Sequence, residues 1–201
     1  MIAKPCYGCS VVVLVSVLLA APATVRAQPV TKRIADAVLP LPEDLRAGAT
    51  VVTYDPATGA RKVLRQGTNQ VECQPPDMKA METTCYAQVA APQFDLEAKL
   101  AAEGKSPEQV QAGIAAAREA GTLAPPAFGT MLYVLRHDDR RIRLLWVMLV
   151  PGATSESIGV STVTERNDGL KGQGRPWLML AGTPNAHIMI PINGTPLSSG
   201  R

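Results

Sequence analysis

The sequence predicts an α+β domain in which a small, mainly antiparallel sheet carries an inserted helical hairpin. Apolar segments of strand length recur in both halves of the chain, and turn residues separate them. Residues that start and end helices are concentrated between these two groups, at 95–121. The strand-like segments lack the regular crossover helices of a parallel sheet, so an antiparallel arrangement is expected.

The first 27 residues are predicted to be a secretory signal peptide. Lys4 supplies a positive charge, residues 10–21 are uncharged and mostly apolar, and Val25-Arg26-Ala27 places small residues where a signal peptidase cleaves. The apolar run is shorter than the ~20 residues that span a bilayer. We therefore expect a periplasmic or secreted chain that begins at Gln28 and has no stable membrane span after cleavage.

The rest of the chain has the length of one domain with a core of its own. Residues 28–48 are predicted to be an N-terminal lead, rich in Pro and Ala, with one short helix near 42–46. Residues 49–192 are predicted to be a single α+β domain. Residues 193–201 contain Gly, Ser and Pro and are predicted to be a flexible tail.

The predicted strands begin with a hairpin. Residues 49–54 are rich in β-branched side chains, the turn 55–59 contains Pro and Gly, and residues 61–64 form the return strand. A further strand runs into Val71 and Cys73. The later strands are predicted at 130–135, 143–150, 176–181 and 186–192.

The predicted helical hairpin lies in the middle of the chain. Asp95 is the expected cap of a first helix that ends near Gly104. Ser106-Pro107-Glu108-Gln109 is a stronger start, because Ser can cap the helix, Pro suits its first position and Gln completes a capping box. Gly121 ends the second helix.

Two cysteines remain after cleavage, because Cys6 and Cys9 lie in the signal peptide. In an oxidising compartment the pair Cys73 and Cys85 predicts one disulfide. The segment 73–92 contains several prolines and few periodic apolar residues, so it is predicted to be a long loop that this disulfide closes.

Composition and motifs give no reason to expect catalysis or nucleic-acid binding. The chain has 20 basic and 17 acidic residues, two of the basic ones in the signal peptide, so its surface offers no strong field for nucleic acid. Neither a Gly-x-Ser-x-Gly elbow nor a His-Glu-x-x-His motif is present. We expect an exported protein that binds a protein partner or a small ligand, with no cofactor. A hydrolase with catalytic residues dispersed in sequence is an alternative.

A second alternative is a Cu(I)-binding protein. His187 and Met189 are two positions apart on a predicted strand and therefore share a face, and Met148 follows His137 after ten intervening residues. Imidazole and thioether groups suit Cu(I). The pattern is similar to the motif of a periplasmic copper-chaperone family with a cupredoxin-like fold, although that family places its His-x-Met closer to the preceding methionine. Alternatively, the methionines fill the core and His187 bonds to backbone.

The C-terminal half also resembles a known group of proteins. Residues 176–179, Pro-Trp-Leu-Met, are followed at 182–189 by Gly-Thr-Pro-Asn-Ala-His-Ile-Met. This stretch resembles the end of an uncharacterised family of exported bacterial proteins, and residues 64–69 with Cys73 resemble its N-terminal part. The resemblance implies export and a common fold, and it brings no activity with it.

Overall fold

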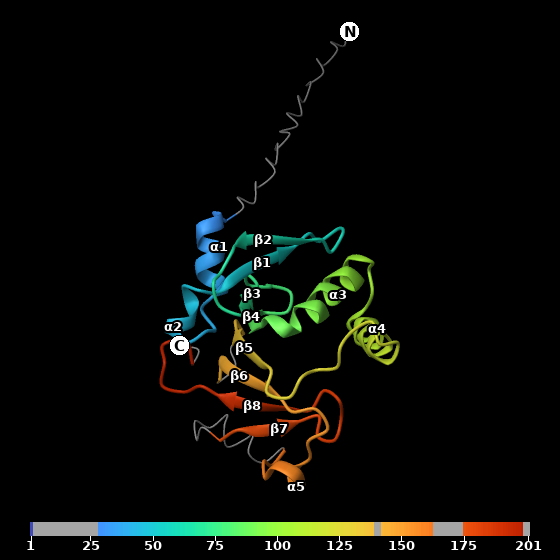
Figure 1. The fold of residues 1–201 in the computed structure, drawn as a ribbon. Coiled ribbons are helices and arrows are strands. Elements are labelled where there is room, and N and C mark those ends of the chain that lie inside the picture. Colours follow the sequence, from blue (N-terminus) through green and yellow to red (C-terminus); the bar gives the residue numbers. More distant parts are fainter. Residues whose placement is uncertain (2–27, 139–141, 163–174, 199–201) are drawn as a thin grey trace.

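The computed structural model describes residues 1, 28–138, 142–162 and 175–198. In these residues all eight strands belong to one sheet, and helices pack on it (Figure 1). Every neighbouring pair of these strands is antiparallel except β1 and β3. The predicted α+β class is therefore confirmed. The signal peptide predicted for 1–27 lies outside the described residues apart from residue 1.

The helices are α1 (Val30–Ala37), α2 (Glu43–Arg46), α3 (Ala91–Ala102), α4 (Pro107–Glu119) and α5 (Ser155–Ile158), with a 3₁₀ turn at Gln88–Ala90. The strands are β1 (Thr50–Tyr54), β2 (Arg61–Arg65), β3 (Val71–Cys73), β4 (Glu82–Ala87), β5 (Met131–Arg136), β6 (Leu144–Leu149), β7 (Trp177–Met179) and β8 (His187–Pro191). Their order in the sheet is β2-β1-β3-β4-β5-β6-β8-β7. Six of these strands match the segments predicted from the sequence, and β3 contains both residues named for it.

The first hairpin forms as its turn residues predict. The carboxylate of Asp55 accepts hydrogen bonds from the backbone N–H groups of Ala57 and Thr58, and Gly59 has a φ of 69°. Beyond β2 the chain crosses back at Gly67, where a Cβ would overlap the backbone of Gly48. The absence of a side chain at Gly67 lets β3 pair with β1 on the side away from β2.

The prediction of a long loop over 73–92 is wrong, because this segment contains β4. The strand lies between β3 and β5 in the middle of the sheet. Cys73 and Cys85 are directly opposite each other on β3 and β4 and form the predicted disulfide, with an S–S distance of 2.07 Å. Pro75 and Pro76 lie in the connection before β4. These prolines indicated a loop for the whole segment, although only the part before β4 is a loop.

Residues from both the predicted lead, 28–48, and the predicted tail, 193–201, pack into the domain. Ala37 and Leu41 are buried in a first core cluster with Val51 and the disulfide. Ser198 is buried as well, and its carbonyl accepts a hydrogen bond of 2.9 Å from the backbone N–H of Arg143. Both segments pack on the sheet because burial of its apolar surface stabilises the fold.

The two middle helices, α3 and α4, contact each other. The capping box of α4 forms as predicted: the Ser106 hydroxyl accepts from the Gln109 backbone N–H at 3.3 Å, and the Gln109 side chain accepts from the Ser106 N–H at 2.9 Å. The start of α3 was predicted incorrectly. The helix begins at Ala91, and Asp95 instead accepts a hydrogen bond of 2.7 Å from the hydroxyl of Tyr54.

Strand register assigns each side chain to one of two faces, because directly opposite residues share a face. The α1 face carries Cys85, Tyr133 and Trp146, which are paired across β4, β5 and β6. The α3 face carries Tyr86, which stacks on Phe94 of α3 at 3.8 Å between ring centroids. Figure 1 shows α1 and α2 on one side of the sheet and α3 and α4 on the other.

Candidate ligand pocket

Strand register separates the four residues considered as Cu(I) ligands. On β6 and β8, Leu149 is opposite His187 and Met148 is opposite Ile188. His187 and Met189 therefore lie on the α3 face, while Met148 lies on the α1 face. His137 follows β5 at the end remote from the partner of Met148, about 20 Å along the strand. The fold does not gather the four side chains at one point.

The surroundings of these residues match the structural interpretation. Met148 packs against a second core cluster that contains Leu178 and Ile188. Nδ1 of His187 is 2.8 Å from the backbone carbonyl of Asn185, and since a carbonyl can only accept, this nitrogen is the donor. No group of three or more His, Cys, Asp or Glu residues in the described parts of the chain is arranged to hold a metal ion.

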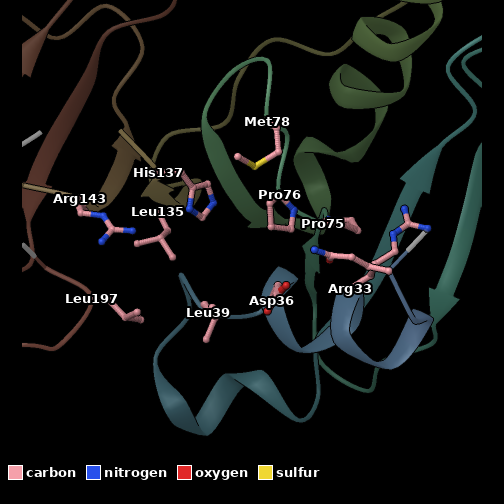
Figure 2. Close-up of a pocket in the computed structure, with 11 residues that line it drawn as sticks. Arg33, Asp36, Leu39, Pro75, Pro76, Met78, Leu135, His137, Arg143 and Leu197 are labelled. Carbon is pink, nitrogen blue, oxygen red and sulfur yellow. The ribbon is translucent and has the colours of Figure 1, made fainter. Parts of the chain in front are cut away.

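His137 instead lines a cavity of about 600 Å³ on the α1 side of the sheet. Its volume lies within the roughly 300–1,000 Å³ of small-molecule sites. We call this cavity the α1 pocket (Figure 2). It is lined by Gln28, Arg33, Asp36, Leu39, Pro75, Pro76, Met78, Leu135, His137, Arg143 and Leu197.

One part of the α1 pocket is apolar. Leu135 of β5 is only 1% exposed and belongs to the wall of the cavity, together with Leu39 and Leu197 from the two ends of the chain. Met78 is 64% exposed, and Figure 2 shows it across the cavity from Leu39. Because a methionine side chain is unbranched and flexible, it can cover apolar groups of different shapes.

Charged side chains also line the α1 pocket, with Arg143 and Arg33 on opposite sides of it (Figure 2). The guanidinium group of Arg143 is fixed at its Nε, which donates to the carbonyl of Arg136 at 2.9 Å. Arg33 of α1 donates to the hydroxyl of Thr53 at 3.0 Å. Asp36 is the acidic residue of the lining, and Lys32 pairs with it at 2.7 Å. The pocket thus combines apolar walls with two arginines.

His137 is positioned by two contacts with β4 and the turn before it. Its backbone N–H donates to the carbonyl of Met81 at 2.8 Å, and its Nε2 is 2.7 Å from the hydroxyl of Thr83. Burial and the positive charge of Arg143 lower the pKa of His137 below the ordinary value of 6.5. The imidazole is therefore mainly neutral at pH 7.

The contact between His137 and Thr83 brings a hydroxyl and an imidazole together, as a hydrolase requires. A nucleophile must also reach its substrate. Thr83 is 0% exposed and lies beneath His137, so its hydroxyl is not available to a molecule in the pocket. This pair therefore orients the imidazole, and it does not support the dispersed hydrolase considered from the sequence.

Of the four Cu(I) ligands predicted from the sequence, His137 is the one that lines the α1 pocket. The lining comes from four segments far apart in the chain, at 28–39, 75–78, 135–143 and 197. None of these segments has a recognisable spacing of ligands. Arg143 and Leu135 belong to strands or strand ends predicted from apolar pattern alone, so no local signal marked them.

Comparisons with protein-family models, with curated proteins and with solved structures found no match. No helix among the described residues is long and apolar enough to cross a bilayer. The arrangement of the α1 pocket is therefore the basis for assigning a function.

Proposed function

We propose that this protein is an exported, non-catalytic binding protein that holds a small amphipathic organic molecule in the α1 pocket. The observation that carries the proposal is a cavity of about 600 Å³ lined by Leu39, Leu135 and Leu197 and by Arg33 and Arg143. Small-molecule sites typically combine a mainly apolar lining with a few polar groups that orient the ligand.

Export is supported by the predicted signal peptide and by the disulfide. Lys4, the apolar run 10–21 and the small residues at 25 and 27 have the order of a cleavable signal. Disulfides persist in oxidising compartments, and Cys73 and Cys85 are joined. The resemblance to exported bacterial proteins supports the same compartment. Expression in a bacterium followed by intact-mass measurement should give a chain that begins at Gln28, and a retained Met1 would contradict export.

Ligand binding can be tested with N-phenyl-1-naphthylamine, a neutral apolar dye that fluoresces when it leaves water. We expect saturable binding to the purified protein. Replacing Leu39 or Leu197 with Trp fills the pocket, since both side chains are half-buried in its wall, and should weaken dye binding at least 10-fold.

Val89→Trp is the matched control, because Val89 is exposed and does not line the α1 pocket. This variant should bind the dye like the wild type. If one of the two pocket variants is destabilised and melts at a lower temperature, the other still tests whether the dye binds in the pocket. Unsaturable binding, or equal affinity in wild type and in both folded pocket variants, would refute the proposed function.

A further inference from the structure

We infer that the molecule held in the α1 pocket is an amphipathic organic anion, whose carboxylate lies between Arg143 and His137 and whose apolar body lies against Leu135. The inference rests on the proposed function and names the class of its ligand. It depends on three features of the pocket: its excess positive charge, the free donors of Arg143, and the contact of His137 with Thr83.

The charge of the lining favours an anion. Arg33 and Arg143 contribute two positive charges, and Asp36 contributes one negative charge. Both carboxylate oxygens of Asp36 accept hydrogen bonds from Lys32, at 3.0 and 2.7 Å. Lys32 pairs with Asp36 and offsets part of its negative charge, so the lining keeps an excess of positive charge. Burial and the charge of Arg143 lower the pKa of His137, which places Arg143 close enough to act on the imidazole.

The terminal nitrogens of the Arg143 guanidinium group can donate hydrogen bonds to a carboxylate. Its Nε is bonded to the carbonyl of Arg136, and its backbone N–H is bonded to the carbonyl of Ser198. Within the described residues, the two terminal nitrogens of its guanidinium group make no hydrogen bond. Figure 2 shows the side chains of Arg143 and His137 directed toward the same part of the cavity. A guanidinium group held at Nε is well prepared to bind a carboxylate.

The contact with Thr83 lets His137 serve as a donor in two protonation states. A hydroxyl can donate or accept, so Thr83 can pair with Nε2 whether or not this nitrogen carries a proton. When Thr83 donates, Nδ1 of the neutral ring carries the proton and can donate to an anion. When the ring is protonated, Nε2 donates to Thr83 and Nδ1 still carries a proton.

Anion binding is therefore expected to favour protonated His137. The charged groups that act on this imidazole are Arg143, which disfavours its protonation, and Asp36, Asp138 and Glu82, which favour it. Arg136 pairs with both Glu82 and Asp138, which weakens their effect. A bound carboxylate would offset the charge of Arg143, so affinity for the anion should rise as pH falls below 7.

The apolar wall provides for the rest of the ligand. Leu135 of β5 lies near His137 and Arg143, and Leu39 and Leu197 belong to the same apolar wall (Figure 2). An aliphatic chain on a carboxylate has this same division between an anionic head and an apolar body. Decanoate and 1-decanol are suitable probes, because they share the chain and differ in the charge of the head.

The test measures the displacement of N-phenyl-1-naphthylamine by the two probes at pH 7.5. We expect decanoate to bind about 10-fold or more tightly than 1-decanol, since hydrogen bonds to charged groups are stronger than those between neutral groups. Arg143→Gln should abolish most of this preference. Lys62→Gln is the matched control, because it removes one exposed positive charge outside the pocket and should leave the preference unchanged.

A second series repeats the decanoate titration at pH 5.5. Affinity should increase several-fold relative to pH 7.5 in the wild type and not in His137→Gln, while 1-decanol affinity should not change. If 1-decanol binds as tightly as decanoate and Arg143→Gln has no effect, the ligand is not an anion, although the proposed function survives. If neither probe displaces the dye, the assignment of the ligand class fails, whereas the proposed function fails only on the dye measurements with the two pocket variants.

Discussion

The helical layers on the two faces of the sheet are built in different ways. Neither α1 nor α2 has a side-chain cap, yet this layer contributes Ala37, Val38 and Leu41 to the core beside the disulfide. On the opposite face, α4 begins with a complete capping box, and Ile114 is its one buried residue. Long-range burial therefore holds the α1 layer, while local hydrogen bonds contribute more to α4; α3, like α1, has no side-chain cap.

The α1 pocket reflects this long-range assembly, because segments far apart in the chain line it. A layer that is assembled from the chain ends leaves space where those ends meet the sheet, and Leu39 and Leu197 line that space from opposite ends of the described chain. On the other face, Phe94 stacks on Tyr86, and α3 and α4 line a smaller cavity of about 380 Å³. The ionisable groups on the two sides differ as well. On the α3 side, burial raises the pKa of Glu97, whereas two arginines, Arg33 and Arg143, line the α1 pocket.

The strongest test of this comparison is Leu41→Ala. Leu41 is 2% exposed in the first core cluster, so truncation should lower the free energy of unfolding by about 3–4 kcal/mol. Leu96→Ala removes the same atoms from a half-buried position on α3 and should cost less than half as much. Urea denaturation measures both, and equal losses would show that the two layers are anchored alike.

The disulfide should have the next largest effect. Cys73 and Cys85 are separated by 12 positions and join two central strands beneath α1. Replacing both with Ala should lower the free energy of unfolding by roughly 3 kcal/mol, mainly because the unfolded chain is no longer constrained. Reductant should destabilise the wild type by a similar amount and leave the double variant unchanged. A wild type that is insensitive to complete reduction would contradict this expectation.

On the α3–α4 side, Ser106→Ala removes the side chain that caps α4 and should cost about 1 kcal/mol. Ser106→Asp keeps an oxygen that can accept from the Gln109 N–H, so its stability should stay near that of the wild type. Thermal melts of the three proteins distinguish a capping effect from a general effect of substitution. Identical melts for Ser106→Ala and wild type would show that the cap contributes nothing.

The smallest expected effect is a pH dependence from His137. Because its pKa is lower in the folded than in the unfolded protein, the unfolded chain takes up more protons below pH 7. Stability should thus fall as pH decreases through 6.5, and should stop falling from this cause below the folded-state pKa. The loss should stay under about 1 kcal/mol, since solvent screens a partly exposed group.

His137→Gln removes the group that titrates and should flatten this part of the stability profile between pH 7 and 5. His187→Gln is the matched control, because His187 lies on the other face and its Nδ1 bonds to the nearby carbonyl of Asn185. Urea denaturation without ligand at several pH values gives the profile. A pH dependence that persists in His137→Gln and disappears in His187→Gln would contradict its assignment to His137.

Sequence patterns predicted the elements whose hydrogen bonds are local. The turn at Asp55 and the capping box at Ser106 form between residues two to three positions apart, so the sequence shows both partners together. The strand β4 was missed because Pro75 and Pro76 dominated the composition of its segment. Its place in the sheet depends on pairing with β5, whose residues lie about fifty positions further along the chain.

By itself, the sequence determined the fold class, the capped start of α4 and the pairing of Cys73 with Cys85, because each depends on residue types at short spacing. Only the tertiary structure decided that residues 28–48 join the core and that Arg33, Leu135 and Arg143 meet in one pocket. The order of the strands and the burial of the chain ends bring these residues together. Both depend on the free energy of contacts between distant segments, which no local pattern records.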